Sequence, residues 1–162
     1  PGGPESSKLA ERDREAGREN PFTLPRPMLD SNDYDFSFSG IKTSVLYKIK
    51  EKETLTEIEK EQMAREFEDA VSEVLWKKAS RALDESGARM LIIGGGVAAN
   101  KHIQRLFTDM IAKDHPEVTL HIPSRDLTTD NALMIGLAGY YRALRKEFKT
   151  DVTANGNLHL AP

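Results

Sequence analysis

The chain has 162 residues, of which 38% are hydrophobic and 30% are charged, so its length and composition suit one compact globular domain. The absence of cysteine excludes a disulfide framework, a thiolate nucleophile and a cysteine-ligated zinc site, and no apolar run approaches the roughly 20 residues of a membrane helix, so we expect no membrane partner. A formal net charge of −3 excludes a global attraction to nucleic acid, so any RNA would need a local patch or further protein parts.

The first 38 residues show little regular periodicity. The chain opens with Pro1-Gly2-Gly3-Pro4 and no methionine, which we interpret as a boundary inherited from a longer protein. Residues 1–20 are polar and predict at most a short helix that opens near Ser6. Prolines exclude a regular helix in residues 20–38, where aromatic residues at 34, 36 and 38 alternate with polar ones as in a strand. We expect an irregular, partly extended segment there.

Two helices are predicted next. Residues 39–50 form the first, with Val45, Leu46 and Ile49 on one face. Residues 55–83 form a long second helix, with Thr56 and Glu59 as a capping box and Gly87 as its stop. Apolar residues recur along it at helical spacing: Ile58, Met63, Phe67, Val71, Val74, Leu75, Ala79 and Ala82. We interpret this helix as packing and its charged residues as a solvated face.

The pattern then changes to alternating strands and helices. Residues 89–93 predict a buried parallel strand that runs into the glycine turn 94–96. A helix over 98–113, broken at His115-Pro116, leads to a second strand over 118–122, on which His121 is expected to be exposed. A third helix is predicted over 130–147, with these residues inward: Leu133, Met134, Leu137, Ala138 and Tyr141. The resulting α–β–α–β–α order favours a parallel or mixed sheet, and residues 150–162 show no strong signal.

The loop 94–100, Gly-Gly-Gly-Val-Ala-Ala-Asn, is the first candidate site. Glycines let a backbone approach a ligand closely, and the helix that follows offers free N–H groups to an anion or polar ligand. The loop matches neither a Walker motif nor the dinucleotide fingerprint, which would need glycine at Ala99. The alternative is a tight strand-to-helix turn with Asn100 capping the helix, and from pattern alone both readings stay open.

The second candidate, Thr128-Thr129-Asp130-Asn131, again follows a strand and opens a helix. Ligands gather beyond the carboxyl ends of strands in α/β sheets, so the loops 94–100 and 124–131 are expected to lie side by side. Asp130 is of a type that binds hard or borderline metals, although aspartate at a helix start is more often a cap. A third candidate, residues 37–43, reads more simply as a helix start, and the four histidines form no protease-type zinc motif.

Five motifs stand in order along the chain: Pro1-Gly2-Gly3-Pro4, Pro25-Arg26-Pro27, Asp35-Phe36-Ser37-Phe38-Ser39-Gly40-Ile41-Lys42-Thr43, Gly95-Gly96-Val97-Ala98-Ala99-Asn100 and Thr129-Asp130-Asn131-Ala132-Leu133-Met134-Ile135. Each is weak alone, but together they resemble the TsaD-type family of tRNA threonylcarbamoyladenosine transferases, once called glycoproteases or O-sialoglycoprotein endopeptidases. The resemblance runs from residue 1 to about residue 142.

This resemblance implies an α/β fold, a ribonuclease-H-like lobe of the actin, Hsp70 and sugar-kinase (ASKHA) fold with helical insertions. Residues 1–162 would be a single C-terminal lobe of a larger two-lobed protein. About 5–83 would be a mostly helical insertion, and 88–147 the α/β core with the nucleotide and metal loops.

The resemblance also implies a reaction and its site. The family moves a threonylcarbamoyl group from threonylcarbamoyl-AMP, the adenylate donor, to N6 of the adenosine 3′ of the tRNA anticodon, in t6A biosynthesis. By the matching motifs Asp130 is expected as a ligand of one divalent metal, iron or zinc. Gly3, Gly95, Gly96 and Asn100 are expected to contact the donor or its nucleotide. No catalytic residue is assigned, and the weaker candidates are Ser39, Lys42 and Asn131.

The departures from the family pattern are equally informative. The family's two metal histidines stand on an H-x-x-x-H motif upstream of Pro-Gly-Gly-Pro, and this chain has no such motif. We therefore predict that the chain is inactive without an N-terminal lobe. The implied partners are tRNA, paralogous proteins and an ATPase, and the implied location is the cytoplasm, with mitochondria as the alternative. The alternative function is a non-catalytic nucleotide- or protein-binding module of the same fold.

Overall fold

The computed structural model describes residues 2–52, 54–148 and 153, apart from the side chain of Arg125. Its elements in chain order are helix α1 (Gly2–Ala16), α2 (Ser39–Glu51), α3 (Glu57–Ser86), strand β1 (Met90–Ile92), the 3-10 turn η1 (Gly96–Ala99), α4 (Lys101–Asp114), β2 (Thr119–His121), η2 (Arg125–Leu127) and α5 (Ala132–Leu144). The predicted order of alternating helices and strands from α3 onward is confirmed. The strands pair in parallel, with Met90 opposite Thr119 and Ile92 opposite His121.

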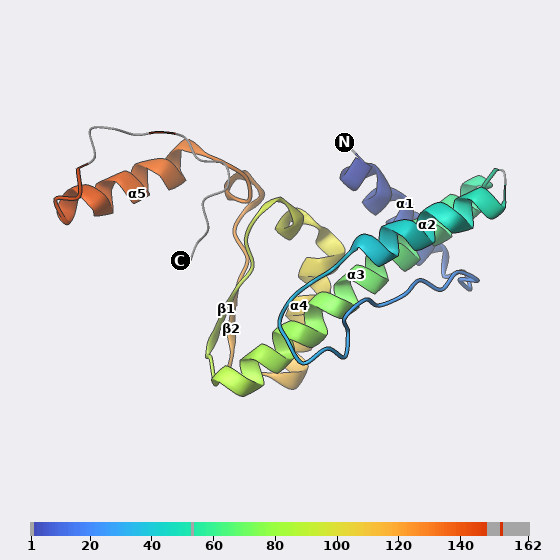
Figure 1. Cartoon of the computed structure of the whole chain (residues 1–162), viewed down its shortest axis with the longest axis horizontal. Helices are drawn as coiled ribbons and strands as arrows, with labels where there is room; N and C mark the ends of the chain where they lie inside the picture. Colours follow the sequence, from blue (N-terminus) through green and yellow to red (C-terminus); the bar gives the residue numbers. More distant parts are fainter. Residues whose placement is uncertain (1, 53, 149–152, 154–162) are drawn as a thin grey trace.

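Helix α3 is the central helix, against which α1, α2 and α4 pack. Figure 1 shows it as a long diagonal helix, with α1 and α2 alongside its N-terminal half and α4 beside its C-terminal half. One apolar core joins α3 to the irregular segment and α2: Phe22, Leu24, Ile41, Met63 and Ala70. A second joins α3 to α4 and the residue before β2: Trp76, Leu83, Ile103, Phe107, Ile111 and Val118. Each large apolar side chain buried in these cores contributes about 1.5–3 kcal/mol.

Both predicted ends of α3 are confirmed. The Thr56 hydroxyl accepts a hydrogen bond from the Glu59 N–H at 3.2 Å, and the Glu59 carboxylate accepts one from the Thr56 N–H at 2.9 Å. Gly87 ends the helix in the left-handed conformation, with φ of 64°, where a side chain would be strained. The local sequence therefore determines where this helix begins and ends.

The capping box predicts a pH dependence of stability. Hydrogen bonds from Lys52 and from the backbone and hydroxyl of Thr56 lower the pKa of Glu59 from its usual 4.5 to about 2. Because the folded pKa lies below the unfolded one, this stabilisation is fully present above about pH 4.5 and is lost as pH falls through about 2. We expect Glu59→Gln to flatten the stability–pH curve in that window, measured by urea unfolding at a series of pH values. A Glu59 carboxylate that titrates near its usual pKa by NMR would contradict this.

The inward faces of α2 and α3 differ from the prediction only in part, since Met63 and Val74 are buried as expected. On α2, Ile41 is buried and Val45 packs on the core, whereas Leu46 and Ile49 are exposed. On α3, Phe67 and Ile58 are also exposed, and Trp76 takes a core position. Periodicity identifies apolar residues on a helix, but the neighbouring elements decide which of them are covered.

The interpretation of the α3 charges as a solvated face is wrong for part of the helix. Several polar and charged side chains of this helix are buried: Gln62, Glu66, Glu68, Ser72 and Lys78. Residues 20–38 contain no helix or strand, which confirms their predicted irregular character. Lys78 is almost completely buried and donates hydrogen bonds to this segment. The described residues 34–38 form no strand, because the carbonyl groups of Asp33 and Asp35 bond to Lys78 instead of to a neighbouring strand.

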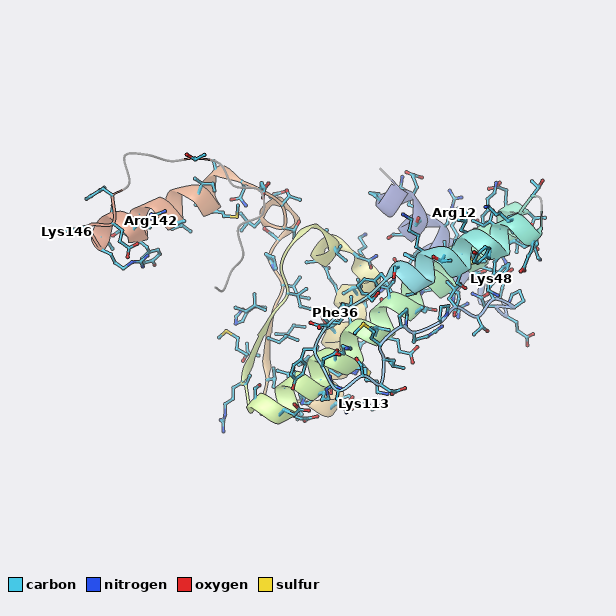
Figure 2. The ribbon with its side chains drawn as sticks, viewed as in Figure 1. Arg12, Phe36, Lys48, Lys113, Arg142 and Lys146 are labelled. Carbon is cyan, nitrogen blue, oxygen red and sulfur yellow. The ribbon has the colours of Figure 1, made fainter. Side chains whose placement is uncertain are left out.

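Strand β1 and helix α5 are more exposed than predicted. Met90 and Ile92 on β1 are 54% and 68% exposed, so this strand is not buried on both faces. Helix α5 buries none of its residues, so the five side chains expected to point inward are exposed. In Figure 1, α5 projects away from the other helices, and Figure 2 shows Arg142 and Lys146 at its far end. A two-stranded sheet has too little surface to cover an additional apolar helix.

The structure also bears on membrane insertion. Within the described residues, no helix combines the length and the apolar character that spanning a bilayer requires.

Candidate functional site: two loops at the carboxyl ends of the strands

The two candidate loops lie side by side, as predicted. Because β1 and β2 are parallel, their carboxyl ends meet at one edge, and each runs into a loop that opens a helix (Figure 1). A methyl group placed on Gly96 would lie 3.9 Å from the Thr129 Cγ2 atom, which shows how closely the loops approach. Gly95 has φ of 84° and ψ of 173°, a conformation that essentially only glycine adopts. Glycine at 95 is therefore needed for the turn itself.

Asn100 caps helix α4, as predicted by the interpretation of the loop as a strand-to-helix turn. Its Oδ1 atom accepts a hydrogen bond from the Ile103 N–H at 3.0 Å. Its Nδ2 atom donates to Ser7 Oγ at 3.0 Å and to Glu68 Oε1 at 2.6 Å. Both amide hydrogens are thus used within the chain, and one lone pair of Oδ1 is left for a ligand. The cap and a ligand contact are therefore chemically compatible at this side chain.

Glu68 is the centre of a buried network that sequence reasoning missed. Besides Asn100, its Oε1 atom accepts a hydrogen bond from Ser7 Oγ at 3.0 Å, and its Oε2 atom pairs with Arg14. The network joins α1, α3 and the glycine loop. Asn100 lies 32 residues from Glu68 and 93 from Ser7 in sequence, so no local pattern could reveal these contacts.

In the second loop the cap is Asn131. Its Oδ1 atom accepts a hydrogen bond from the Met134 N–H at 2.9 Å, and its Nδ2 atom donates to the Thr129 carbonyl at 2.9 Å. The interpretation of Asp130 as the cap of this helix is thus wrong. Asp130 is exposed, and no hydrogen bond or ion pair reaches it within the described part of the chain. Its carboxylate remains available to a ligand.

The other predicted site residues differ in how they relate to the two loops. Gly3 lies in α1 one helical turn before Ser7, on the same helix face as the residue that bonds Asn100. Ser39 begins α2, where its hydroxyl lies 3.1 Å from Ser37 Oγ, and Lys42 is exposed on that helix. Among the residues that the structure describes, no hydrogen bond or ion pair joins Ser39 or Lys42 to either loop.

An open depression of about 430 Å³ lies between α1 and α4, apart from the two loops. At its wall, His102 Nε2 lies 3.2 Å from Asp69 Oδ1, and Arg14 also pairs with Asp69. Burial opposes ionisation of Asp69, but the hydrogen bonds from His102 and Arg14 outweigh it and lower the pKa of this carboxyl. Across the same wall, hydrogen bonds from Arg105 lower the pKa of Glu11. Since Asp69 and Glu11 each have basic partners, the charges of these two acids are balanced locally.

His115 is buried, and its contacts are those of a residue that packs within the fold. Its Nε2 atom lies 2.7 Å from Ser80 Oγ, and its ring packs at 5.9 Å against Trp76. The Asp84 carboxylate lies 3.8 Å from Nδ1, beyond hydrogen-bond distance, so the ring lacks the orienting acid of a hydrolase triad. Among the described residues, moreover, no group of three or more histidine, cysteine, aspartate or glutamate side chains is arranged to hold a metal ion.

Comparison with known proteins identifies one family model, tRNA N6-adenosine threonylcarbamoyltransferase, over residues 1–137. The protein of that name from Thermosipho africanus (strain TCF52B) is 39% identical over 162 residues, which cover all of this chain and 46% of that protein. Its counterpart from Thermosipho melanesiensis is 41% identical over 140 residues, 86% of this chain and 40% of that protein. The Staphylococcus aureus (strain Newman) protein is 38% identical over 161 residues, 99% and 45% of the two lengths. The chain therefore spans less than half the length of these relatives.

Proposed function

Because this chain belongs to the TsaD family, tRNA N6-adenosine threonylcarbamoyltransferase, we propose that it supplies the donor-binding part of such an enzyme. The enzyme would move a threonylcarbamoyl group from threonylcarbamoyl-AMP to N6 of the adenosine 3′ of the tRNA anticodon. The observation that carries the proposal is the close approach of loops 94–100 and 124–131 at the carboxyl ends of two parallel strands. That edge is where α/β sheets bind their ligands.

The adenylate is proposed to bind chiefly at the glycine loop. Backbone at Gly95 and Gly96 has no side chain to keep the adenosine moiety away, and the turn is already shaped by the conformation of Gly95. Asn100 offers the free lone pair of Oδ1, and Gly3 lies on the α1 face that bonds Asn100. Ser39, Lys42 and Asn131 are weaker candidates, because Asn131 is used as a cap and the first two lie on α2.

The metal needs residues beyond those described. Asp130 is exposed and has no hydrogen-bond or ion-pair partner among the described residues, which suits one ligand of a divalent metal such as iron or zinc. The described residues do not complete a ligand set around Asp130, so the metal does not fit the described part of the chain by itself. Accordingly, inactivity of the isolated chain stays a prediction.

The remaining parts of the proposal concern fold and partners. The order of helices and strands with a parallel pair is compatible with a ribonuclease-H-like lobe of the ASKHA fold, in which residues 5–83 are a helical insertion and 88–147 the core. A first lobe, tRNA, paralogous proteins and an ATPase are the proposed partners. The exposed apolar side chains of β1 and α5 leave surface for further protein. The cytoplasmic location, with mitochondria as the alternative, also stays a prediction.

Titration of this chain with AMP, followed by isothermal calorimetry, tests the donor site. We expect saturable binding that Asn100→Ala weakens by roughly tenfold, the effect of losing one hydrogen bond to a ligand. The matched control is Thr56→Ala, which also removes a helix cap but lies on α3, in a cap that shares no contact with the loops. Binding that both substitutions weaken equally, or no binding by the unaltered chain, would contradict a nucleotide site in the loop 94–100.

A further inference from the structure

We propose that Glu68 is a positioning residue, which holds the Asn100 amide in one orientation and thereby shapes the nucleotide loop 94–100. The ligand side of this inference rests on the proposed function. The part about Asn100 itself rests only on the geometry of the buried network.

The contacts place Glu68 directly behind the loop. Its side chain extends from α3, is 9% exposed, and reaches Asn100 Nδ2 at 2.6 Å. Ser7 from α1 donates to the same carboxylate oxygen at 3.0 Å and accepts from Asn100 at 3.0 Å, which closes a three-membered ring of hydrogen bonds. Two elements distant in sequence, α1 and α3, therefore converge on the amide group of Asn100.

The chemistry of this ring specifies the orientation of the amide. An asparagine side chain has two orientations of nearly equal intrinsic energy, related by exchange of oxygen and nitrogen. A flipped Asn100 would turn Oδ1 toward the Glu68 carboxylate, which cannot donate, and would turn Nδ2 toward the Ile103 N–H, which cannot accept. Both hydrogen bonds would be lost in a partly buried site. Glu68 thus selects the orientation in which Oδ1 caps α4 and keeps one lone pair free.

Arg14 explains how the carboxylate can remain at this position. Its guanidinium pairs with Oε2 of Glu68, so the negative charge is compensated on the side away from Asn100. A buried carboxylate needs such a partner, because an uncompensated charge in the interior is strongly destabilising. The two oxygens of Glu68 therefore have separate tasks: Oε2 satisfies Arg14, and Oε1 holds Ser7 and Asn100.

The substitution Glu68→Gln changes this arrangement at nearly constant shape. Arg14 and Asn100 donate to different oxygens of Glu68, and an amide has an acceptor oxygen on one side but a donor NH2 group on the other. Glutamine at this position therefore cannot accept from both. The matched control is Glu66→Gln on the same helix, since Glu66 and Glu68 are each 8% exposed as whole residues. Glu66 accepts hydrogen bonds from the Leu24 N–H and from Arg26, and among the described residues no hydrogen bond or ion pair joins it to the loop 94–100. Any general effect of neutralising a buried glutamate on α3 will appear in both variants.

Two readouts on this chain decide the proposal. Amide hydrogen exchange at Ile103, whose N–H is held by Asn100 Oδ1 at 3.0 Å, should accelerate by about tenfold in Glu68→Gln and change by less than about twofold in Glu66→Gln. The affinity for AMP should fall by about tenfold in Glu68→Gln only. In an Asn100→Ala background, Glu68→Gln should weaken AMP binding no further, since a positioning residue acts through Asn100.

The outcomes separate this proposal from the proposed function. Unchanged exchange at Ile103 in Glu68→Gln, or equal acceleration in both glutamate variants, would overturn the positioning role. Accelerated exchange with AMP binding lost additively in the double variant would overturn the action through Asn100. If the unaltered chain binds no AMP, the nucleotide site fails, while the exchange at Ile103 still decides whether Glu68 positions Asn100.

Discussion

Replacing Lys78 by methionine is expected to lower the free energy of unfolding by about 3 kcal/mol, the lower end of the loss from breaking a buried ion pair. The Lys78 ammonium donates to Ser31 Oγ at 2.8 Å, Asp33 Oδ1 at 3.0 Å and the Asp35 carbonyl at 2.6 Å. The side chain of Lys78 is 1% exposed, whereas that of Asp33 is 47% exposed, so water can solvate the acid again after the substitution. That is why the lower end of the range applies.

The physical reason is that Lys78 supplies hydrogen-bond donors to backbone carbonyl groups that no helix or sheet satisfies. The irregular segment before α2 has no sheet partner among the described residues, and the carbonyl groups of Asp33 and Asp35 both accept hydrogen bonds from this one ammonium. The hydrogen bond from Lys78 also lowers the pKa of Asp33. Methionine keeps an apolar stem of similar length but removes every donor. We expect the midpoint of thermal unfolding, followed by circular dichroism, to fall by roughly 6–12 °C for a chain of this size.

Lys77 provides the matched control. It is the preceding residue on α3 and pairs with Asp30 at 2.5 Å, but the two side chains are 54% and 81% exposed. Exposed ion pairs contribute about 0–1 kcal/mol, so Lys77→Met should shift the midpoint by less than roughly 4 °C. Equal shifts for both lysines would show that Lys78 does not organise the segment.

The second large effect is expected at Trp76, the single tryptophan of the chain. Trp76→Ala should cost about 4 kcal/mol, as is typical when a large aromatic side chain is removed from a core. The residue is 9% exposed, and its ring packs edge-on against Phe107 with 5.4 Å between the ring centres. Strands β1 and β2 contribute partly buried residues to this same core, so the loops at their carboxyl ends depend on it. Urea unfolding followed by circular dichroism measures the change without needing tryptophan fluorescence.

Phe67 on the same helix is the control for this prediction. Helical spacing predicts Phe67 as an inward residue, but the structure leaves it 39% exposed. We expect Phe67→Ala to cost less than about 1 kcal/mol, because a side chain that stays partly in water loses little on truncation. A larger loss at position 67 than at position 76 would favour the sequence pattern over the observed packing.

Features that depend on adjacent residues were predictable from the sequence. The capping box of Thr56 and Glu59, the stop at Gly87, the cap at Asn100 and the break at His115-Pro116 each need only a few neighbouring residues. The parallel pairing of β1 and β2 also follows, because strands joined by a helix connect most simply in parallel. From that pairing, the adjacency of the two candidate loops could be predicted.

The sequence by itself thus determined the order of helices and strands from α3 onward, both ends of α3, the start of α4 and the place of the two loops, because these depend on local propensity and on strand direction. It did not show that α1 extends from Gly2 to Ala16. Only the tertiary structure decided which apolar residues are covered and which charges are buried. Glu68, Lys78 and Trp76 acquire their roles from partners on other elements, and Phe67 loses its expected one because no element covers it. Contacts across such separations in sequence leave no periodic trace, so only the folded chain reveals them.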